Sequence, residues 1–170
     1  MIVIRQEDAN DARQVRRVNE LAFGRPEEAD LVEKLRRNCP DYLSLVAEDG
    51  PVVGHIAFTP VTVDDGSRQV VGMGLAPMAV RPENQRQGVG TQLVRRGLEV
   101  LSERGCPFVV VLGHPDYYPR FGFEPASRFD LKSQWDGIPD DAFMAMLLDR
   151  NALTGVSGVA RFRDEFDDVT

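Results

Sequence analysis

Gln85, Gly88 and Gly90 are spaced Q-x-x-G-x-G directly before a stretch with helical periodicity. Glycines at a helix start let a ligand approach free backbone N–H groups closely. Those groups and the helix dipole favour an anion, usually a phosphate. The spacing therefore predicts either a pyrophosphate cradle or a glycine-rich turn before an ordinary helix. The apolar residues that indicate the helix fall on one face: Val89, Leu93, Val94, Leu98 and Leu101.

Two better-known phosphate loops do not fit this stretch. A dinucleotide site needs G-x-G-x-x-G, and the position three after Gly90 is Leu93. It also needs an acid about 20 residues on, and residues 108–112 there read F-V-V-V-L. A Walker loop needs Gly-Lys-Ser/Thr, and the chain has no such triplet. The cradle therefore belongs to another class.

A second motif lies downstream, where residues 108–123 read F-V-V-V-L-G-H-P-D-Y-Y-P-R-F-G-F. They predict a buried strand, a short turn or helix, and then Tyr118-x-x-x-Gly122-Phe123. The two motifs, with a helix and a strand between them, resemble the GCN5-related N-acetyltransferase (GNAT) family over roughly residues 3–150. The similarity is to a bacterial branch with G-H-I-A-F-like and Y-Y-x-R-F-G-F segments. It implies an enzyme that uses acetyl-CoA.

The resemblance assigns residues to the cofactor. Backbone N–H on the strand around Met78 would donate to the thioester oxygen, Val80 would pair with pantetheine, and Ala79 lies between them. Tyr118 would sit beside the CoA sulfur as general acid, since a tyrosine with a pKa near ~10 is protonated at neutral pH. The alternative is a packed aromatic residue, and the register with Gly122-Phe123 favours the acid role. Tyr117 is expected to pack. The pyrophosphate contacts are expected from Gln85, Arg86, Gln87, Gly88, Val89, Gly90 and Thr91.

The general base has several candidates. His55 lies on a strand and can act directly or through water, but a hydrogen-bonded core histidine is the alternative. Glu28 lies in the helix that walls the acceptor site in this family, but an acid at a helix start is also favoured by the dipole. His114 lies near a strand end, and the alternative to a role as base is that it holds a turn with Asp116. Glu83 lies nearer the phosphates than the thioester.

Composition limits the partners. A chain of 170 residues is expected to form one domain. The net charge of −7 and the lack of a long basic run argue against nucleic acid, and suit a cationic acceptor. Cys39 and Cys106 form no disulfide framework or metal pattern, which fits a reduced cytoplasm. No signal peptide or membrane span is expected. A monomer or homodimer is expected.

The expected elements give a mixed α/β sheet. Their order is similar to the single-domain acyl-CoA N-acyltransferase fold, and this resemblance implies a splayed central sheet. Residues 1–150 are expected to form the GNAT domain and residues 151–170 a tail docked on it, with Val156, Val159, Phe162 and Phe166 as the expected contacts. Strands are expected over residues 2–4, 43–47, 52–61, 70–80, 108–112, 123–125 and 143–148, and helices over 12–22, 26–38 and 89–104, with 134–137 as loop.

Two functions fit these residues. The first is an acetyl-CoA-dependent N-acetyltransferase acting on a primary amine of a small molecule or peptide. The second is a non-catalytic acyl-CoA-binding regulatory module. Tyr118 favours the enzyme, because a module that only binds acyl-CoA has no need of a proton donor at the sulfur.

Overall fold

The computed structural model describes residues 1–169, and the chain is arranged in two units. The first unit contains Met1–Thr59, Ala76–Val100 and the end of the chain from Asp164. The second contains Pro60–Leu75 and Leu101–Arg163. Strands β3 (Val52–Asp64) and β4 (Gln69–Val80) run through both units, and so does helix α3 (Val89–Glu103).

In the first unit, β1 (Val3–Gln6) pairs antiparallel with β2 (Leu43–Glu48), which pairs antiparallel with β3. Nearly every residue of β2 is buried, as in a strand covered on both faces. The short β1 is tied to its neighbours by Arg5, which contacts the carboxylates of Asp11 and Glu48 at 2.7 Å each. The N-terminal strand is therefore held by ion pairs as well as by the sheet ladder.

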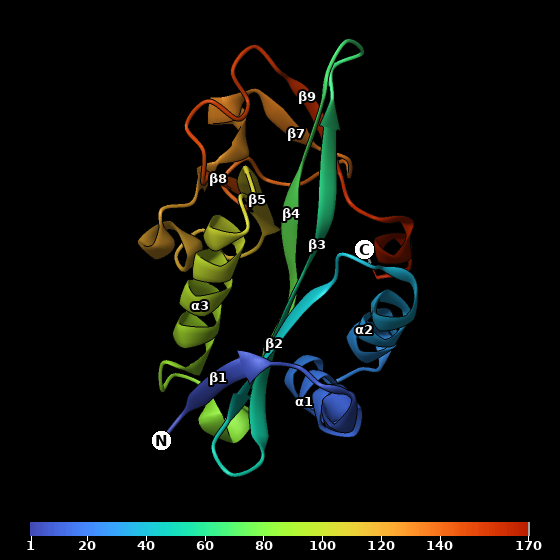
Figure 1. The fold of residues 1–170 in the computed structure, drawn as a ribbon, viewed down its shortest axis with the longest axis vertical. Helices are drawn as coiled ribbons and strands as arrows, with labels where there is room; N and C mark the ends of the chain where they lie inside the picture. Colours follow the sequence, from blue (N-terminus) through green and yellow to red (C-terminus); the bar gives the residue numbers. More distant parts are fainter. Residues whose placement is uncertain (170) are drawn as a thin grey trace. The chain divides into compact units, whose positions relative to one another are not determined.

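Helices α1 (Ala12–Phe23) and α2 (Glu27–Asn38) cover one face of this sheet (Figure 1). A turn of 3-10 helix, η1 (Ala9–Asp11), leads into α1 and is capped by Asp8 through a capping box with Asp11. Gly24, at φ 69°, ends α1 in the left-handed conformation that glycine adopts without strain. The shared apolar cluster consists of Val15, Val18, Val32, Val46, Val52 and Ala79.

Helix α3 covers the opposite face of the same sheet (Figure 1). Two glycines allow a close approach. A Cβ on Gly54 of β3 would lie 2.9 Å from Cγ1 of Val89, and one on Gly97 of α3 would lie 2.5 Å from Cζ of Phe58. Real Cβ atoms do not come so near, so these positions exclude larger residues. The two glycines thereby allow α3 to lie close against β3.

In the second unit, β4 pairs parallel with β5 (Phe108–Leu112), with Met73 opposite Val109 and Leu75 opposite Val111. Strand β8 (Phe143–Leu147) pairs antiparallel with both β5 and β6 (Glu124–Pro125). Parallel and antiparallel pairs thus occur together, which confirms the expected mixed sheet. The expected splay of β4 from β5 stays a prediction.

The end of the second unit contains two strands that the sequence did not predict. Strand β9 (Gly158–Arg161) pairs antiparallel with the end of β3 and parallel with β7 (Leu131–Ser133). Both are too short to show a clear alternation of apolar and polar residues. Of the four predicted contacts, Val156, Phe162 and Phe166 are buried and Val159 is half-buried. The boundary at residue 150 stays a prediction, and Thr170 lies outside the described residues.

The remaining segments are short 3-10 helices: η2 (Pro82–Asn84), η3 (Tyr118–Phe121), η4 (Ala126–Phe129) and η5 (Asp164–Asp168). Within residues 1–169, no helix has the length and apolar composition that a bilayer crossing requires. The same residues contain no group of three or more His, Cys, Asp or Glu side chains placed to hold a metal ion.

Candidate active site

The predicted cradle is a turn between η2 and α3 in the first unit. Arg86 and Gly88 both have positive φ, at 62° and 86°. A non-glycine residue in this region is uncommon and often marks a functional position. A Cβ on Gly88 would meet nothing within 4 Å, so the space beside its Cα is open. The backbone of the turn is therefore accessible at Gly88.

The N-terminus of α3 is suited to an anion. The hydrogen bond from Gln92 N–H to the Gly88 carbonyl, at 3.1 Å, opens the helical ladder. The N–H groups of Val89 and Gly90 come before it and have no acceptor in an earlier helical turn. The first turn of α3 contains no acidic residue. With the helix dipole, these groups fit the phosphates of a nucleotide.

The end of β4 presents backbone groups on the side away from β3. The N–H of Arg81 donates to the Val53 carbonyl at 2.9 Å, so the backbone of Arg81 faces β3. Backbone groups alternate along a strand, so those of Val80 and Met78 face away from β3 and those of Ala79 face toward it. Gln85 donates from Nε2 to the Val80 carbonyl at 2.9 Å. This bond ties the cradle to the strand end.

Tyr118 belongs to the second unit, where it begins η3 and is 7 % exposed. Its ring meets Tyr117 edge-on with centroids 5.1 Å apart and Phe123 at 5.8 Å. Among the described residues, its hydroxyl has no protein hydrogen-bond partner. Burial raises the pKa of Tyr118, and the neighbouring Tyr117 adds to the rise. The hydroxyl therefore stays protonated through neutral and mildly alkaline pH.

His55 lies on β3, facing α1, and is completely buried. Asn19 Nδ2 lies 3.1 Å from His55 Nδ1, and Ser44 Oγ lies 2.9 Å from Nε2. An amide nitrogen can only donate, so Nδ1 accepts and the ring proton sits on Nε2. Both ring nitrogens are therefore engaged within the core. Burial lowers the pKa of His55 to about 3, with a smaller effect from the charge of Arg36.

This buried histidine predicts a pH-dependent stability. The unfolded state takes up a proton below a pKa of 6.5, whereas the folded state does so only near 3, so stability falls as pH drops between these values. From pH 6.5 to pH 5 we expect a loss of about 2 kcal/mol in the free energy of unfolding. Urea denaturation at several pH values measures it.

His55→Gln is the matched control for that measurement, because it keeps a polar side chain but does not titrate. The decline between pH 6.5 and pH 5 should be smaller in this variant by about 2 kcal/mol. Parallel stability curves for the two proteins would show that His55 does not cause the decline. Hydrogen bonds from Arg5 lower the pKa of Asp11, so protonation of carboxylates such as this one reduces stability only at lower pH.

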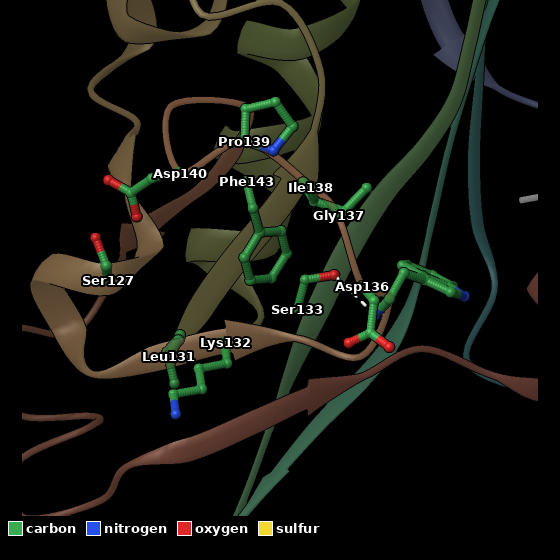
Figure 2. A pocket seen from close by; sticks show the side chains of 11 residues that line it. Ser127, Leu131, Lys132, Ser133, Asp136, Gly137, Ile138, Pro139, Asp140 and Phe143 are labelled. Atoms are coloured by element: carbon green, nitrogen blue, oxygen red, sulfur yellow. Dashed lines mark hydrogen bonds between the residues drawn. The ribbon is translucent and has the colours of Figure 1, made fainter.

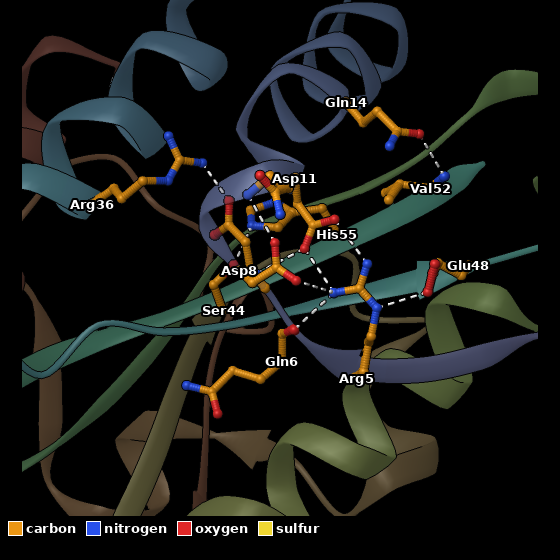
Figure 3. A network of polar contacts seen from close by, with 12 residues as sticks. Arg5, Gln6, Asp8, Asp11, Gln14, Arg36, Ser44, Glu48, Val52 and His55 are labelled. Atoms are coloured by element: carbon orange, nitrogen blue, oxygen red, sulfur yellow. Dashed lines mark hydrogen bonds and ion pairs between the residues drawn. The ribbon is translucent and has the colours of Figure 1, made fainter.

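The network around His55 was not predicted from the sequence (Figure 3). Tyr42 lies 3.5 Å from His55 Nε2 and 3.4 Å from Glu7 Oε1, and Arg36 holds the other Glu7 oxygen at 2.5 Å. These residues come from separate segments, so no local spacing joins them. The network buries polar groups with partners on most sides, which is how a core tolerates them.

Glu28 is 7 % exposed at the start of α2. Arg25 donates from Nε to both carboxylate oxygens, at 2.8 and 3.2 Å, and from a terminal nitrogen to Oε2. A proton-accepting role for Glu28 would therefore require Arg25 to move. Glu83 is exposed, and its carboxylate lies 3.8 Å from Arg81. His114 is exposed too, and its carbonyl accepts from Tyr117 N–H at 3.1 Å.

A separate cavity of about 390 Å³ lies in the second unit (Figure 2). Phe143 and Leu131 form its buried part, and the loop with Trp135 and Asp136 lies beside them. Its charged residues are exposed and extend from different sides of the Phe143 ring (Figure 2). Because the polar groups do not converge, the cavity does not indicate a specific ligand.

Comparison with known proteins identifies the family. The family described as Acetyltransferase (GNAT) domain matches residues 3–126. This chain belongs to the GNAT family. It is 40% identical to the Escherichia coli N-acetyltransferase YhbS over 168 residues, covering 98% of this chain and 99% of that protein. It is 46% identical to YjhQ from the same organism over 123 residues, covering 71% and 68%.

Solved structures of GNAT proteins agree with this assignment. YhbS from Escherichia coli, crystallised in complex with CoA, matches with a TM-score of 0.91 at 38% identity, covering 99% of this chain and 93% of that one. A GNAT acetyltransferase from Brucella melitensis in complex with acetyl-CoA matches with a TM-score of 0.78 at 34% identity, covering 98% and 99%. The predicted family, fold class and enzyme class are confirmed, and the individual site residues stay predictions.

Proposed function

We propose that this GNAT chain transfers the acetyl group of acetyl-CoA to a primary amine of a small molecule or peptide. The observation that carries the proposal is the open turn at Gly88, whose backbone and helix N-terminus suit a pyrophosphate. The relatives of known structure contain CoA and acetyl-CoA. Residues 85–91 would hold the phosphates, and the outward backbone of Met78 and Val80 would pair with the pantetheine arm.

Bound acetyl-CoA would supply an activated acyl group as a thioester. In the transfer, a carbon–nitrogen bond forms and the carbon–sulfur bond breaks. The Met78 N–H would donate to the carbonyl oxygen as it gains charge. Tyr118 would give its proton to the departing sulfur, and its raised pKa keeps that proton available at neutral pH. The amine must also lose a proton. His55 has both ring nitrogens engaged within the core and Glu28 is paired with Arg25, so solvent is the proton acceptor that needs no rearrangement.

The net charge of −7 favours a cationic acceptor, which is the ordinary state of an amine in water. Cytoplasmic location and a monomeric or homodimeric state stay predictions. Thiol release from acetyl-CoA, measured with aliphatic diamines, amino sugars, free amino acids and peptides, tests the function. Amine-dependent release with an acetylated product in mass spectrometry would support it. Calorimetric binding of CoA without release for any amine would favour a binding module.

A further inference from the structure

We propose that Gly113 is a positioning residue for Tyr118: its missing side chain lets the tyrosine ring lie against the backbone at the end of β5. This inference rests on the proposed role of Tyr118 as proton donor. A Cβ on Gly113 would lie 3.0 Å from Cδ2 and 3.5 Å from Cζ of Tyr118, and nearer still to Cε2. The ring edge next to the hydroxyl-bearing carbon therefore occupies the place of a side chain.

The backbone of Gly113 does not itself require glycine. Its φ lies outside the left-handed region in which other residues are strained, unlike that of Gly122 in the same segment. The contact with the Tyr118 ring is thus the physical reason that the structure offers for glycine at this position. Alanine can adopt the backbone conformation but would overlap the ring.

The backbone of Gly113 is held in place by hydrogen bonds. It directly follows β5, and its N–H donates to the Ala142 carbonyl at 2.9 Å, next to β8. The segment between Gly113 and Tyr118 forms a turn. The N–H groups of Tyr117 and Tyr118 both donate to the His114 carbonyl, at 3.1 and 3.4 Å. An added methyl group should therefore displace the ring more than the backbone.

The other sides of the Tyr118 ring are also occupied. Tyr117 and Phe123 meet it at interplanar angles of 88° and 77°, and Phe121 lies 6.4 Å away between ring centroids. A ring enclosed in this way can shift only as a whole, and its hydroxyl shifts with it. General acid catalysis depends on the heavy-atom distance between donor and acceptor, so a small shift reduces the assistance.

Gly113→Ala is expected to lower kcat by about 10- to 100-fold, no more than Tyr118→Phe does, and to leave the calorimetric Kd for CoA and the KM for the amine within about twofold. The assay is thiol release with the fastest amine of the panel.

Gly74→Ala is the matched steric control. A Cβ there would lie 2.5 Å from Cε2 of Phe162 and 2.7 Å from Cγ2 of Val61, so it disturbs another aromatic ring of the same unit. It should lower thermal stability without lowering kcat of the folded protein.

The double variant Gly113→Ala/Tyr118→Phe decides between positioning and a merely structural role. If Gly113 acts by placing the hydroxyl, kcat of the double variant equals that of Tyr118→Phe within about twofold. The proposal would be overturned if Gly113→Ala lowered kcat by the same factor in the parent protein and in Tyr118→Phe. So would an unchanged kcat in Gly113→Ala beside a low kcat in Tyr118→Phe, which leaves the proton-donor role intact. An unchanged kcat in Tyr118→Phe would instead overturn the proton-donor role itself.

Discussion

Tyr118→Phe is expected to keep CoA affinity and to lower turnover by about 100-fold, at the lower end of the ~100- to 10,000-fold range of general acid assistance. The change removes only the hydroxyl, so the contacts with Tyr117 and Phe123 remain. The lower end is expected because a thiolate is already a fair leaving group, with a pKa near ~8.5 for free cysteine. Steady-state kinetics of thiol release and calorimetry with CoA measure both quantities.

Tyr117→Phe is the matched control, since it changes the neighbouring residue in the same way. The Tyr117 ring, which meets the Arg120 guanidinium at 4.4 Å, keeps its packing role, so turnover should change little. Because burial raises the pKa of Tyr118, loss of its proton should not lower turnover between pH 7 and about 10. If Tyr118→Phe and Tyr117→Phe both turn over at the rate of the parent protein, Tyr118 is not the proton donor.

Gly88→Asp is expected to weaken CoA binding by about 100-fold or more, since a like charge beside the phosphates costs several kcal/mol. The Gly88 Cα faces open space, so the carboxylate would enter the region that we assign to the ligand. Calorimetric titration with CoA measures the effect. Unchanged affinity in a folded Gly88→Asp variant would rule out the cradle.

Two controls separate charge from backbone strain in that experiment. Gly88→Asn has nearly the same shape without the charge, so it should weaken binding less than Gly88→Asp. Gly105→Asp adds the same residue at another open position with positive φ, 78°, after α3. It should lower stability to a similar degree while CoA affinity stays at the parent value. Equal affinities in the Asp and Asn variants at position 88 would assign the loss to strain.

The sequence predicted the elements that have strong local patterns. The turn and helix from Gln85 were visible because the glycines stand at fixed spacing before a regular apolar face. The buried strand Phe108–Leu112 was visible as an unbroken apolar run. Strands β7 and β9 were missed because they have only three and four residues and depend on pairing with distant segments.

The surroundings of the candidate catalytic residues depend on tertiary contacts, which spacing does not encode. The sequence offered His55 as a base or as a core histidine, and only its contacts with Asn19 and Ser44 show that both ring nitrogens are engaged. Arg25 precedes Glu28 by three residues, a spacing at which a pairing could have been inferred. Gly113 lies within the second motif, but its contact with Tyr118 depends on the fold of the turn between them and was not predicted.

The two units of the chain are interleaved along the sequence. The polypeptide passes from one to the other within β3, within β4, within α3 and again after Arg163. No continuous gene fragment therefore encodes either unit. Deleting one unit would leave the other with truncated copies of β3, β4 and α3. Exchange of a single continuous segment between relatives therefore cannot transfer a whole unit. We expect calorimetry to record one cooperative unfolding transition, because neither unit has a complete set of elements of its own.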